Sequence, residues 1–427
     1  MIHLDAAATS PVRAEVLQAV MPLFTETFGN PASHHEAGES AARALEWGRG
    51  LVAEACGVKP GRVVFTSGGT ESNALALHGT ALARPRGRHV LVSAIEHPSV
   101  ARAAEQLGEW HGFEVQTVPV LASGLVDPAE VAARLRPDTT LVALMAVNNE
   151  VGTVQPVAEV SALARAVGAR VHVDAVQAGA WLHLAPLATS ADTLSLSGHK
   201  LGGLKGAGAL VLGRGVSVAP FLDGGGQEGG VRSGTVNVPG AVATGLAVRL
   251  AQHDVERFLG GGAPCGAGPG EALAAAVLVG LAAAGVPASL TGDPASRVPG
   301  IVSFVFPGVH AESVLLELGR RGVLASSGSA CAAGSSEPSE VLTAMGYPAE
   351  VAVGALRLSF SPQLPAAELE AAGAAVVDAV LAVHGLGARA EGKQGPVRGY
   401  TSVRSSRPRV ARPPRPADSL TGRPRSR

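Results

Sequence analysis

The chain has 427 residues, of which 46% are apolar and 16% are charged, and its formal net charge is −1. A chain of this length and apolar content can bury a large core, which excludes an intrinsically disordered protein and a small disulfide-stapled scaffold. The three cysteines, Cys56, Cys265 and Cys331, are too few and odd in number for a disulfide framework. The sequence therefore favours a reducing, cytoplasmic compartment.

Neither the N-terminal residues nor the longest uncharged run indicates a secreted or membrane protein. Residues 1–5 lack the basic start of a signal peptide and already contain Asp5, so we expect no secretion. The uncharged run at 272–290 is mostly alanine, interrupted by glycine and proline, and alanine adds little to membrane insertion. We predict a buried, Ala-rich helix there.

The first half of the chain alternates two patterns. Short β-branched runs at 63–65, 90–92, 141–144, 171–173 and 193–196 are separated by Ala-rich helical segments. This alternation is typical of an α/β domain with a mostly parallel sheet, whose strands are buried on both faces. Between Pro156 and Gly168 the apolar residues recur at helical spacing, and Gly168 is a suitable helix end.

The chain is predicted to contain two folded domains and a tail. A glycine-rich break at 260–270 precedes an α+β region that includes the apolar run 301–305. We predict a large domain at 15–250 and a smaller one formed by 1–14 and 251–387. Residues 388–427 contain eleven Lys or Arg and two acidic residues, which leaves 23 basic and 33 acidic residues in the rest of the chain.

This basic, Pro-rich tail has almost no core-forming residues, so we predict that it is disordered. It is either a solvated appendage or a binding segment for an acidic partner or RNA, and composition alone favours the first. The acidic body should repel nucleic acid, so direct nucleic-acid binding is expected from the tail or not at all.

Three groups of polar residues follow predicted strands, where a parallel sheet places its ligands. Ser67–Asn73, with Gly69 and Thr70, forms a glycine loop before a helix; such a helix start binds phosphate, but the same sequence also caps helices without a ligand. Asp174 ends a buried strand and needs a partner, which a neighbouring loop could also supply. Lys200 follows the next strand, in a glycine-rich turn where a lysine is either a candidate for imine chemistry or a surface residue.

Taken together, these motifs resemble a known family. Asp174-x-x-Gln177 and Ser197-x-His199-Lys200 resemble the pyridoxal-phosphate enzymes of aminotransferase class V, and Ser326–Cys331 followed by Glu337-Pro338-Ser339 resembles the active-site loop of its cysteine desulfurases. Further matching motifs lie at 4–9, 29–31, 96–98, 147–152, 224–228 and 232–235, so the resemblance covers roughly residues 2–381. It implies fold type I of the pyridoxal-phosphate-dependent transferases, with a seven-stranded large domain and a smaller α+β domain that carries the cysteine loop.

The resemblance also implies a role for each matching residue. Lys200 would bond the pyridoxal 5′-phosphate, Asp174 would pair with its ring nitrogen, Gln177 with its ring hydroxyl, and His97 would stack on its ring. Asn149 would lie near the ring and the substrate. Gly69, Thr70, Ser197 and His199 would hold the phosphate, and Thr235 would reach the phosphate of the other subunit of a homodimer. Without the resemblance, His97 could equally be a helix cap and Asn149 a turn residue.

Two further residues would act on the substrate, L-cysteine. Arg357 would bind its carboxylate through the guanidinium fork, although a structural ion pair is the alternative. Cys331 would take the sulfur as a persulfide, leaving L-alanine, and pass it to a sulfur-acceptor protein of iron–sulfur assembly or tRNA thiolation. Cys56 and Cys265 are expected to be inert.

Three positions depart from the family pattern. Ala6 stands where asparagine is usual, Leu204 where proline is usual, and Gly229 where arginine is usual. None of these changes removes a bond-making group. The alternatives to a desulfurase are another class V enzyme, such as a selenocysteine lyase or an aminotransferase, and a catalytically silent scaffold that binds through its tail. Intact Lys200, Asp174 and Cys331 argue against the scaffold.

Overall fold

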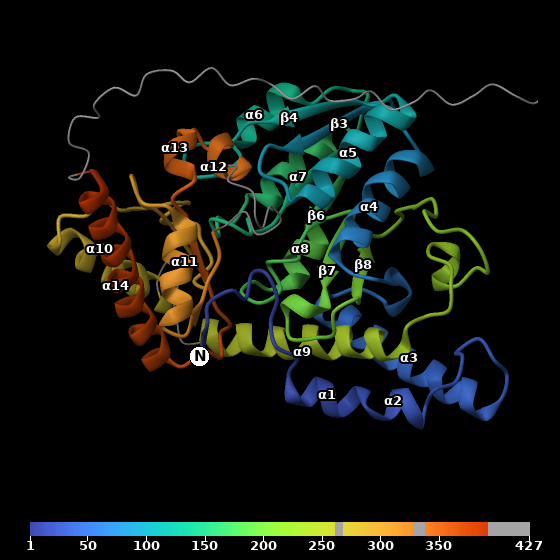
Figure 1. The fold of residues 1–427 in the computed structure, drawn as a ribbon. Helices are drawn as coiled ribbons and strands as arrows, with labels where there is room; N and C mark the ends of the chain where they lie inside the picture. Colours follow the sequence, from blue (N-terminus) through green and yellow to red (C-terminus); the bar gives the residue numbers. More distant parts are fainter. Residues whose placement is uncertain (261–267, 328–337, 392–427) are drawn as a thin grey trace, which may run out of the picture. The chain divides into compact units, whose positions relative to one another are not determined.

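The computed structural model describes residues 1–260, 268–327 and 338–391, and in the helix ends at 259–260 and 386–391 it describes the backbone only. The chain divides into two compact units, Met1–Gly387 and Ala388–Arg427. The first unit contains all three sheets of the described residues and every site residue discussed below, and Figure 1 shows its elements in sequence colours. Cys265 and Cys331 lie outside the described residues.

A seven-stranded sheet forms the centre of the first unit. Its strands, in spatial order, are β2 (Val63–Thr66), β8 (Gly208–Leu212), β7 (Thr193–Ser197), β6 (Arg170–Asp174), β5 (Thr139–Met145), β3 (His89–Ser93) and β4 (Glu114–Val118). β8 runs opposite to the other six strands of this sheet. Apart from the edge strand β4 and the first residue of β6, the strands are buried along their whole length, as β-branched runs predict. The predicted mostly parallel sheet is confirmed.

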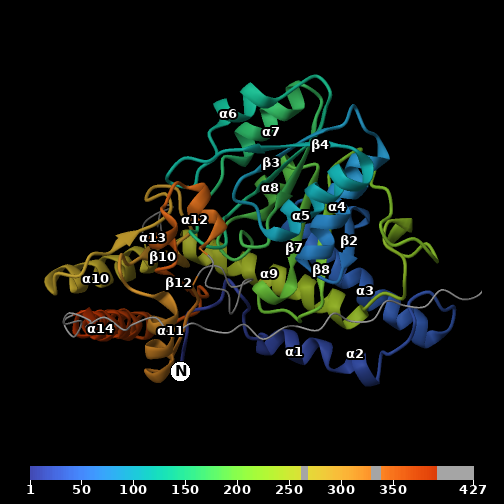
Figure 2. The same cartoon turned by 45° about the horizontal axis from the view of Figure 1, so that its top comes forward.

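Helices cover both faces of this sheet. Val90 and Val92 of β3 pack with α4 (Gly69–Ala83) and α5 (Pro98–His111). Leu91, which lies between them and points to the opposite face, belongs to the larger core with α3 (Glu36–Ala55), α7 (Val157–Ala166), α8 (Leu184–Ser190) and α9 (Val238–Gly260). Figures 1 and 2 show α9 running below the sheet and alongside α3. The predicted helix before Gly168 is α7, and Gly168 follows its end with a φ of +78°.

Shorter helices complete this part of the unit. They are α1 (Ala14–Val20), α2 (Pro22–Thr25) and α6 (Pro128–Arg134), with 3₁₀ turns at Pro60–Arg62, Gly198–Lys200 and Glu228–Gly230. The turn at Gly198–Lys200 follows β7 directly, which places Lys200 at the carboxyl end of that strand.

The remaining elements form two small sheets with their own helices. Strands β9 (Ser289–Leu290), β10 (Ile301–Val305) and β12 (Ala355–Ser359) are antiparallel, and β1 (Ile2–His3) pairs in parallel with β11 (Val323–Leu324). The helices are α10 (Pro269–Ala283), α11 (Ala311–Arg320), α12 (Glu340–Ala344), α13 (Ala349–Ala352) and α14 (Ala366–Glu391). Figures 1 and 2 show α10, α11 and α14 lying together. The boundaries of a large and a small domain stay a prediction.

Two predictions about individual segments differ from the structure. The run 272–290 is not one buried helix: α10 ends at Ala283, a two-residue strand follows at Ser289–Leu290, and Val279 is 69% exposed. Gly285 and Pro287 stop the helix, and alanine is small enough to sit on a half-exposed face. Helix α14 continues past the predicted start of the tail to Glu391, and the rest of the predicted tail lies outside the described residues. Among the described helices, none has the length and apolar character of a membrane span.

Candidate active site at the carboxyl edge of the sheet

The carboxyl ends of the parallel strands surround a cavity of about 580 Å³. Strands β2, β3, β5, β6 and β7 all end there, because parallel strands share one carboxyl edge. Every predicted site residue except Thr235 and Cys331 lines this cavity: Gly69, Thr70, His97, Asn149, Asp174, Gln177, Ser197, His199, Lys200 and Arg357. The fold thus brings together residues that are up to 288 positions apart in the sequence, from Gly69 to Arg357.

The two remaining predicted residues have different positions. Thr235 is exposed and does not line this cavity. Cys331 falls in the segment outside the described residues, but both flanks of that segment are at the cavity. Ser326 exchanges backbone hydrogen bonds with Arg357, at 2.7 and 3.2 Å, and Pro338 is a lining residue.

Asp174 is the buried anion of the site, with 5% of its surface exposed. Its Oδ1 accepts the backbone N–H of Val176 at 2.9 Å, and its Oδ2 accepts the side-chain amide of Asn73 at 2.7 Å. These bonds hold the carboxylate in one orientation at the end of β6. A buried carboxylate is costly unless it meets donors or a positive charge, so this group is suited to a cationic partner in the cavity.

Lys200 and Gln177 both contact the segment that follows β1. Lys200 Nζ donates to the carbonyl oxygens of Ala7 and Ala8, at 2.7 Å to Ala8, and Gln177 Nε2 donates to Ala7 at 2.8 Å. The N-terminal motif at 4–9 therefore forms one wall of the site. Ala7 and Ala8 of this motif are far in sequence from the residues at the strand ends, but they line the same cavity.

Burial and neighbouring cations hold both site histidines neutral. Burial, together with the smaller effect of the charges of Lys200 and Lys205, lowers the pKa of His199 to about 4. His199 Nδ1 is 3.1 Å from the hydroxyl of Thr9. Burial also lowers the pKa of His97, with Asp174 opposing and Lys200 reinforcing the shift. His97 in addition caps α5, so the capping alternative and the site position hold for the same residue.

Arg357 is buried, with 1% of its surface exposed, and forms the structural ion pair that the sequence left as an alternative. Its guanidinium donates to Asp5 Oδ1 at 2.9 Å and to the backbone carbonyl of Asn149 at 3.0 Å. It nevertheless lines the cavity. A substrate carboxylate at this guanidinium would share it with Asp5, and the binding role of Arg357 stays a prediction.

Sequence reasoning assigned no role to several residues that the structure places in the site. Asn73 and Ser99 line the cavity and hydrogen-bond each other at 2.8 Å. Glu96 also lines it; burial raises its pKa to about 8, the backbone N–H of Met145 opposes this shift, and Asp174 adds to it. Glu96 directly precedes His97 in a motif already recognised, and that position was the available signal.

Two ion pairs tie the loop at 224–235 to the rest of the unit, one to α3 and one to the glycine loop. Glu228 binds Arg49 through both carboxylate oxygens at 2.8 Å, and it also accepts the backbone N–H of Phe65. Arg232 binds Glu71 at 2.8 Å. Burial opposes ionisation of Glu71, but the hydrogen bonds from Arg232 and Ser67 outweigh it and lower the pKa. Gly229 has a φ of +65°, which suits glycine and disfavours the arginine usual there.

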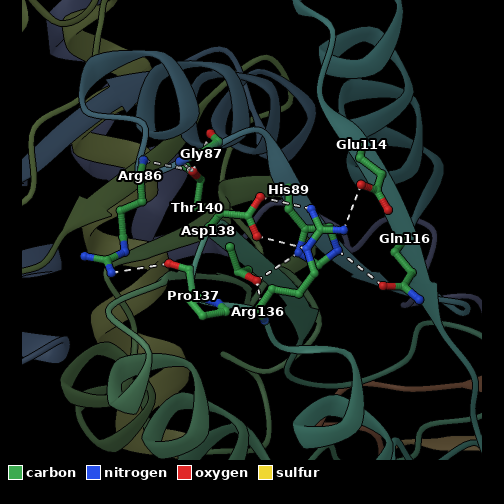
Figure 3. Close-up of polar contacts among 10 residues, drawn as sticks. Arg86, Gly87, His89, Glu114, Gln116, Arg136, Pro137, Asp138 and Thr140 are labelled. Atoms are coloured by element: carbon green, nitrogen blue, oxygen red, sulfur yellow. Dashed lines mark hydrogen bonds and ion pairs between the residues drawn. The ribbon is translucent and has the colours of Figure 1, made fainter.

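A second polar cluster lies at the opposite, amino end of the sheet and serves the fold (Figure 3). Buried His89, at the start of β3, has one ring nitrogen 2.8 Å from Thr139 Oγ1 and the other 3.2 Å from Gln116 Oε1. Around it Arg136 forms exposed ion pairs with Glu114 and Asp138. Both ring nitrogens have side-chain partners in the sheet, so we interpret this cluster as structural. Among the described residues, no group of three or more His, Cys, Asp or Glu side chains could hold a metal ion.

Comparison with known proteins identifies the family. Residues 2–371 match the Aminotransferase class-V family. The chain is 41% identical over 363 residues to the cysteine desulfurase IscS of Methanosarcina thermophila, covering 84% of this chain and 86% of that protein. It is 40% identical over 385 residues to the putative cysteine desulfurase IscS 1 of Bacillus subtilis, covering 89% and 98%.

Solved structures give the same result. A NifS-like protein superposes with a TM-score of 0.79 at 32% identity, covering 88% of this chain and 98% of that one. A structure described as SspA in complex with cysteine superposes with a TM-score of 0.71 at 34% identity, covering 85% and 99%. With this sheet, this cavity and these relatives, the chain belongs to the cysteine desulfurases of the aminotransferase class-V family.

Proposed function

We propose that the protein is a pyridoxal 5′-phosphate-dependent enzyme that converts L-cysteine to L-alanine and holds the sulfur as a persulfide on Cys331. The observation that carries the proposal is the single cavity that joins Lys200, Asp174 and Arg357 and has both flanks of the Cys331 segment beside it. The names of the relatives and the cysteine bound in one similar structure support the same substrate.

The donor set fits pyridoxal 5′-phosphate. Asp174 is a buried carboxylate suited to a protonated ring nitrogen, and Gln177 offers an amide beside it. Thr70, at the start of α4, lies with Ser197 and His199 along the cavity, where backbone N–H groups and hydroxyls favour a phosphate. The bound cofactor supplies an electron sink, and Lys200 is the amine placed to bond it.

The protein's own residues would then carry out the sulfur transfer. The Cys331 thiolate attacks the sulfur of the substrate cysteine: an S–S bond forms, the C–S bond breaks, and a proton is delivered to the substrate β-carbon to complete alanine. Atoms and electrons balance without an external oxidant. His97 lies in the cavity and can hold or give a proton in this sequence.

A homodimer would complete the phosphate site. Thr235 is exposed and lies outside the cavity of its own chain, so it is available to a second copy. A row of large apolar side chains in and after α1 and α2 is also exposed: Leu17 (48%), Met21 (56%), Phe24 (56%) and Phe28 (70%). Such a patch is typical of an interface between subunits. We propose that a second copy covers it.

The acceptor of the sulfur would be a protein of iron–sulfur assembly or of tRNA thiolation. We propose that the enzyme and its acceptor meet in the reducing cytoplasm, because a persulfide carrier and a chain with few cysteines suit that compartment. The basic segment at 388–427 is either an inert appendage or a contact for an acidic acceptor. Deleting it and measuring sulfur transfer to each acceptor separates the two.

The reaction is tested with purified protein, L-cysteine and a thiol reductant, measuring alanine and sulfide together. We expect a yellow protein that releases equal amounts of both products. Cys331→Ala should keep the chromophore and lose sulfide release, and Lys200→Ala should lose the covalent chromophore. Undiminished turnover by Cys331→Ala would contradict the persulfide step and favour another class V activity.

Phe24→Asp should yield monomers by light scattering if the apolar patch is the interface.

A further inference from the structure

Five side chains, four of which line the cavity, form one continuous line of hydrogen bonds that branches at Asn73. His172 Nε2 is 3.0 Å from Asn73 Oδ1. Asn73 Nδ2 lies 2.7 Å from Asp174 Oδ2 and 2.8 Å from Ser99 Oγ. Ser99 Oγ lies 2.8 Å from His97 Nδ1. These bonds connect the fully buried His172 to Asp174 and His97 of the site, and Asn73 contacts three of the other four side chains.

The chemistry of each partner sets the direction of these bonds. A carboxylate oxygen accepts, so the Asn73 amide must present its nitrogen to Asp174; a reversed amide would place two acceptors 2.7 Å apart. The nitrogen has two hydrogens, and Asp174 and Ser99 each receive one. The amide oxygen then faces His172, which must donate from Nε2. Burial keeps His172 neutral by lowering its pKa to about 3, so its Nδ1 accepts from the Thr193 hydroxyl at 3.0 Å.

The same reasoning extends to His97. Ser99 Oγ accepts a hydrogen from Asn73 and lies 2.8 Å from His97 Nδ1, to which its own hydrogen can be donated if that nitrogen is an acceptor. The backbone N–H of Ser99 donates to this same nitrogen at 3.1 Å. With this donor aimed at it, Nδ1 is an acceptor and carries no proton. The proton of the neutral ring is therefore on Nε2.

We propose that Asn73 and Ser99 are positioning residues: one amide fixes the orientation of Asp174 and, through the Ser99 hydroxyl, holds the proton of His97 on Nε2. The functional meaning of this arrangement rests on the proposed desulfurase activity, in which His97 handles protons and Asp174 pairs with the cofactor ring. Capping of α5 explains only the bond from the Ser99 backbone. It does not explain the Ser99 hydroxyl or its link to Asn73.

These hydrogen bonds also oppose the addition of a second proton to His97, which would go to Nδ1. An imidazolium carries a hydrogen on Nδ1, which would face the hydroxyl and amide hydrogens of Ser99. Replacing Asn73 by leucine frees the Ser99 hydroxyl to turn and accept that hydrogen. We therefore expect Asn73→Leu to raise the proton affinity of His97 on the order of tenfold. Ser99→Ala removes the hydroxyl donor and should shift it in the same direction.

The test follows His97 by ¹⁵N NMR of the cofactor-free protein, with the resonance assigned from His97→Gln. In the wild-type protein we expect a pyridine-type Nδ1 and a pyrrole-type Nε2. Gln252→Leu is the matched control: it also removes a buried amide that makes three hydrogen bonds, to Leu184, Gly179 and Leu182, and it lies outside the cavity. It should leave the titration midpoint of His97 unchanged.

Cofactor binding separates the two branches of the line. Asn73 donates to Asp174 and the Ser99 side chain does not, so Asn73→Leu should raise the dissociation constant for added pyridoxal 5′-phosphate about tenfold, whereas Ser99→Ala should not. A wild-type His97 with its proton on Nδ1 would overturn the proposal, whatever the variants do. An unchanged midpoint in folded Asn73→Leu and Ser99→Ala would also overturn it. The expected spectra from a wild-type protein that makes no alanine would instead refute the proposed activity.

Discussion

Glu96 should make the protein less stable as the pH rises, and Glu96→Gln should remove that dependence. Glu96 is buried, with 8% of its surface exposed, and its Oε1 accepts the backbone N–H of Met145 at 2.7 Å. Its Oε2 is buried without a hydrogen-bond partner among the described residues. Burial raises its pKa from 4.5 to about 8, so the folded protein keeps this proton at neutral pH.

The sign and size of the effect follow from proton linkage. Between pH 4.5 and about 8 the folded state binds a proton that the unfolded state has released, so stability falls as the pH rises. Each pH unit in this range lowers the free energy of unfolding by about 1.4 kcal/mol, so the loss of stability amounts to about 3 kcal/mol at pH 7. Glutamine keeps the oxygen that accepts from Met145 and cannot ionise, so Glu96→Gln should gain about this much stability at pH 7.

Denaturant unfolding of the cofactor-free protein at fixed protein concentration measures this difference. The stability gain of Glu96→Gln should be small at pH 5, grow steadily to pH 8 and then level off. Glu159→Gln, which replaces an exposed carboxylate on α7, provides the control and should show a small, constant difference. If the gain from Glu96→Gln is the same at every pH, Glu96 is ionised in the folded protein and the reasoning from its burial is wrong.

Three further predictions concern packing and charge. Gly300→Ala should destabilise the protein by about 2 kcal/mol or more, because the new Cβ would lie 1.9 Å from the Trp181 ring. Gly319→Ala, in an open helical position, should be neutral or stabilise by up to about 1 kcal/mol. Equal denaturant midpoints for the two variants would contradict the packing at Gly300. Arg49→Leu leaves the buried carboxylate of Glu228 without its cation and should cost about 3–5 kcal/mol, with partial recovery when Glu228→Gln is added; a thermal shift no larger than that of an exposed Arg102→Leu would refute a strong pair. Acid should weaken the protein through His199, because its folded pKa is about 4 and the unfolded histidine takes up a proton near 6.5; His199→Asn should flatten the loss of stability between these values, and an unchanged acid limb would exclude this source.

The sequence alone determined the local structure and the chemical inventory of this protein. β-Branched runs that alternate with Ala-rich helical segments predicted strands that are buried on both faces, because a continuous apolar strand is stable only where both faces are covered. Strand-end motifs predicted that Asp174, Ser197 and Lys200 would meet at one edge, because parallel strands share their carboxyl ends. The run at 272–290 misled because alanine is compatible with both a buried and a half-exposed helix.

Only the tertiary structure decided which side chains touch. Asn73 is one turn into a helix and His172 is inside a strand. Nothing in their local sequences shows that Asn73 hydrogen-bonds both His172 and Asp174. Asp5 and Arg357 likewise form an ion pair across 352 positions. Local propensity acts over a few residues, whereas these contacts depend on how the sheet and its helices pack. The tautomer of His97 and the proton on Glu96 are therefore properties of the fold and are absent from any single motif.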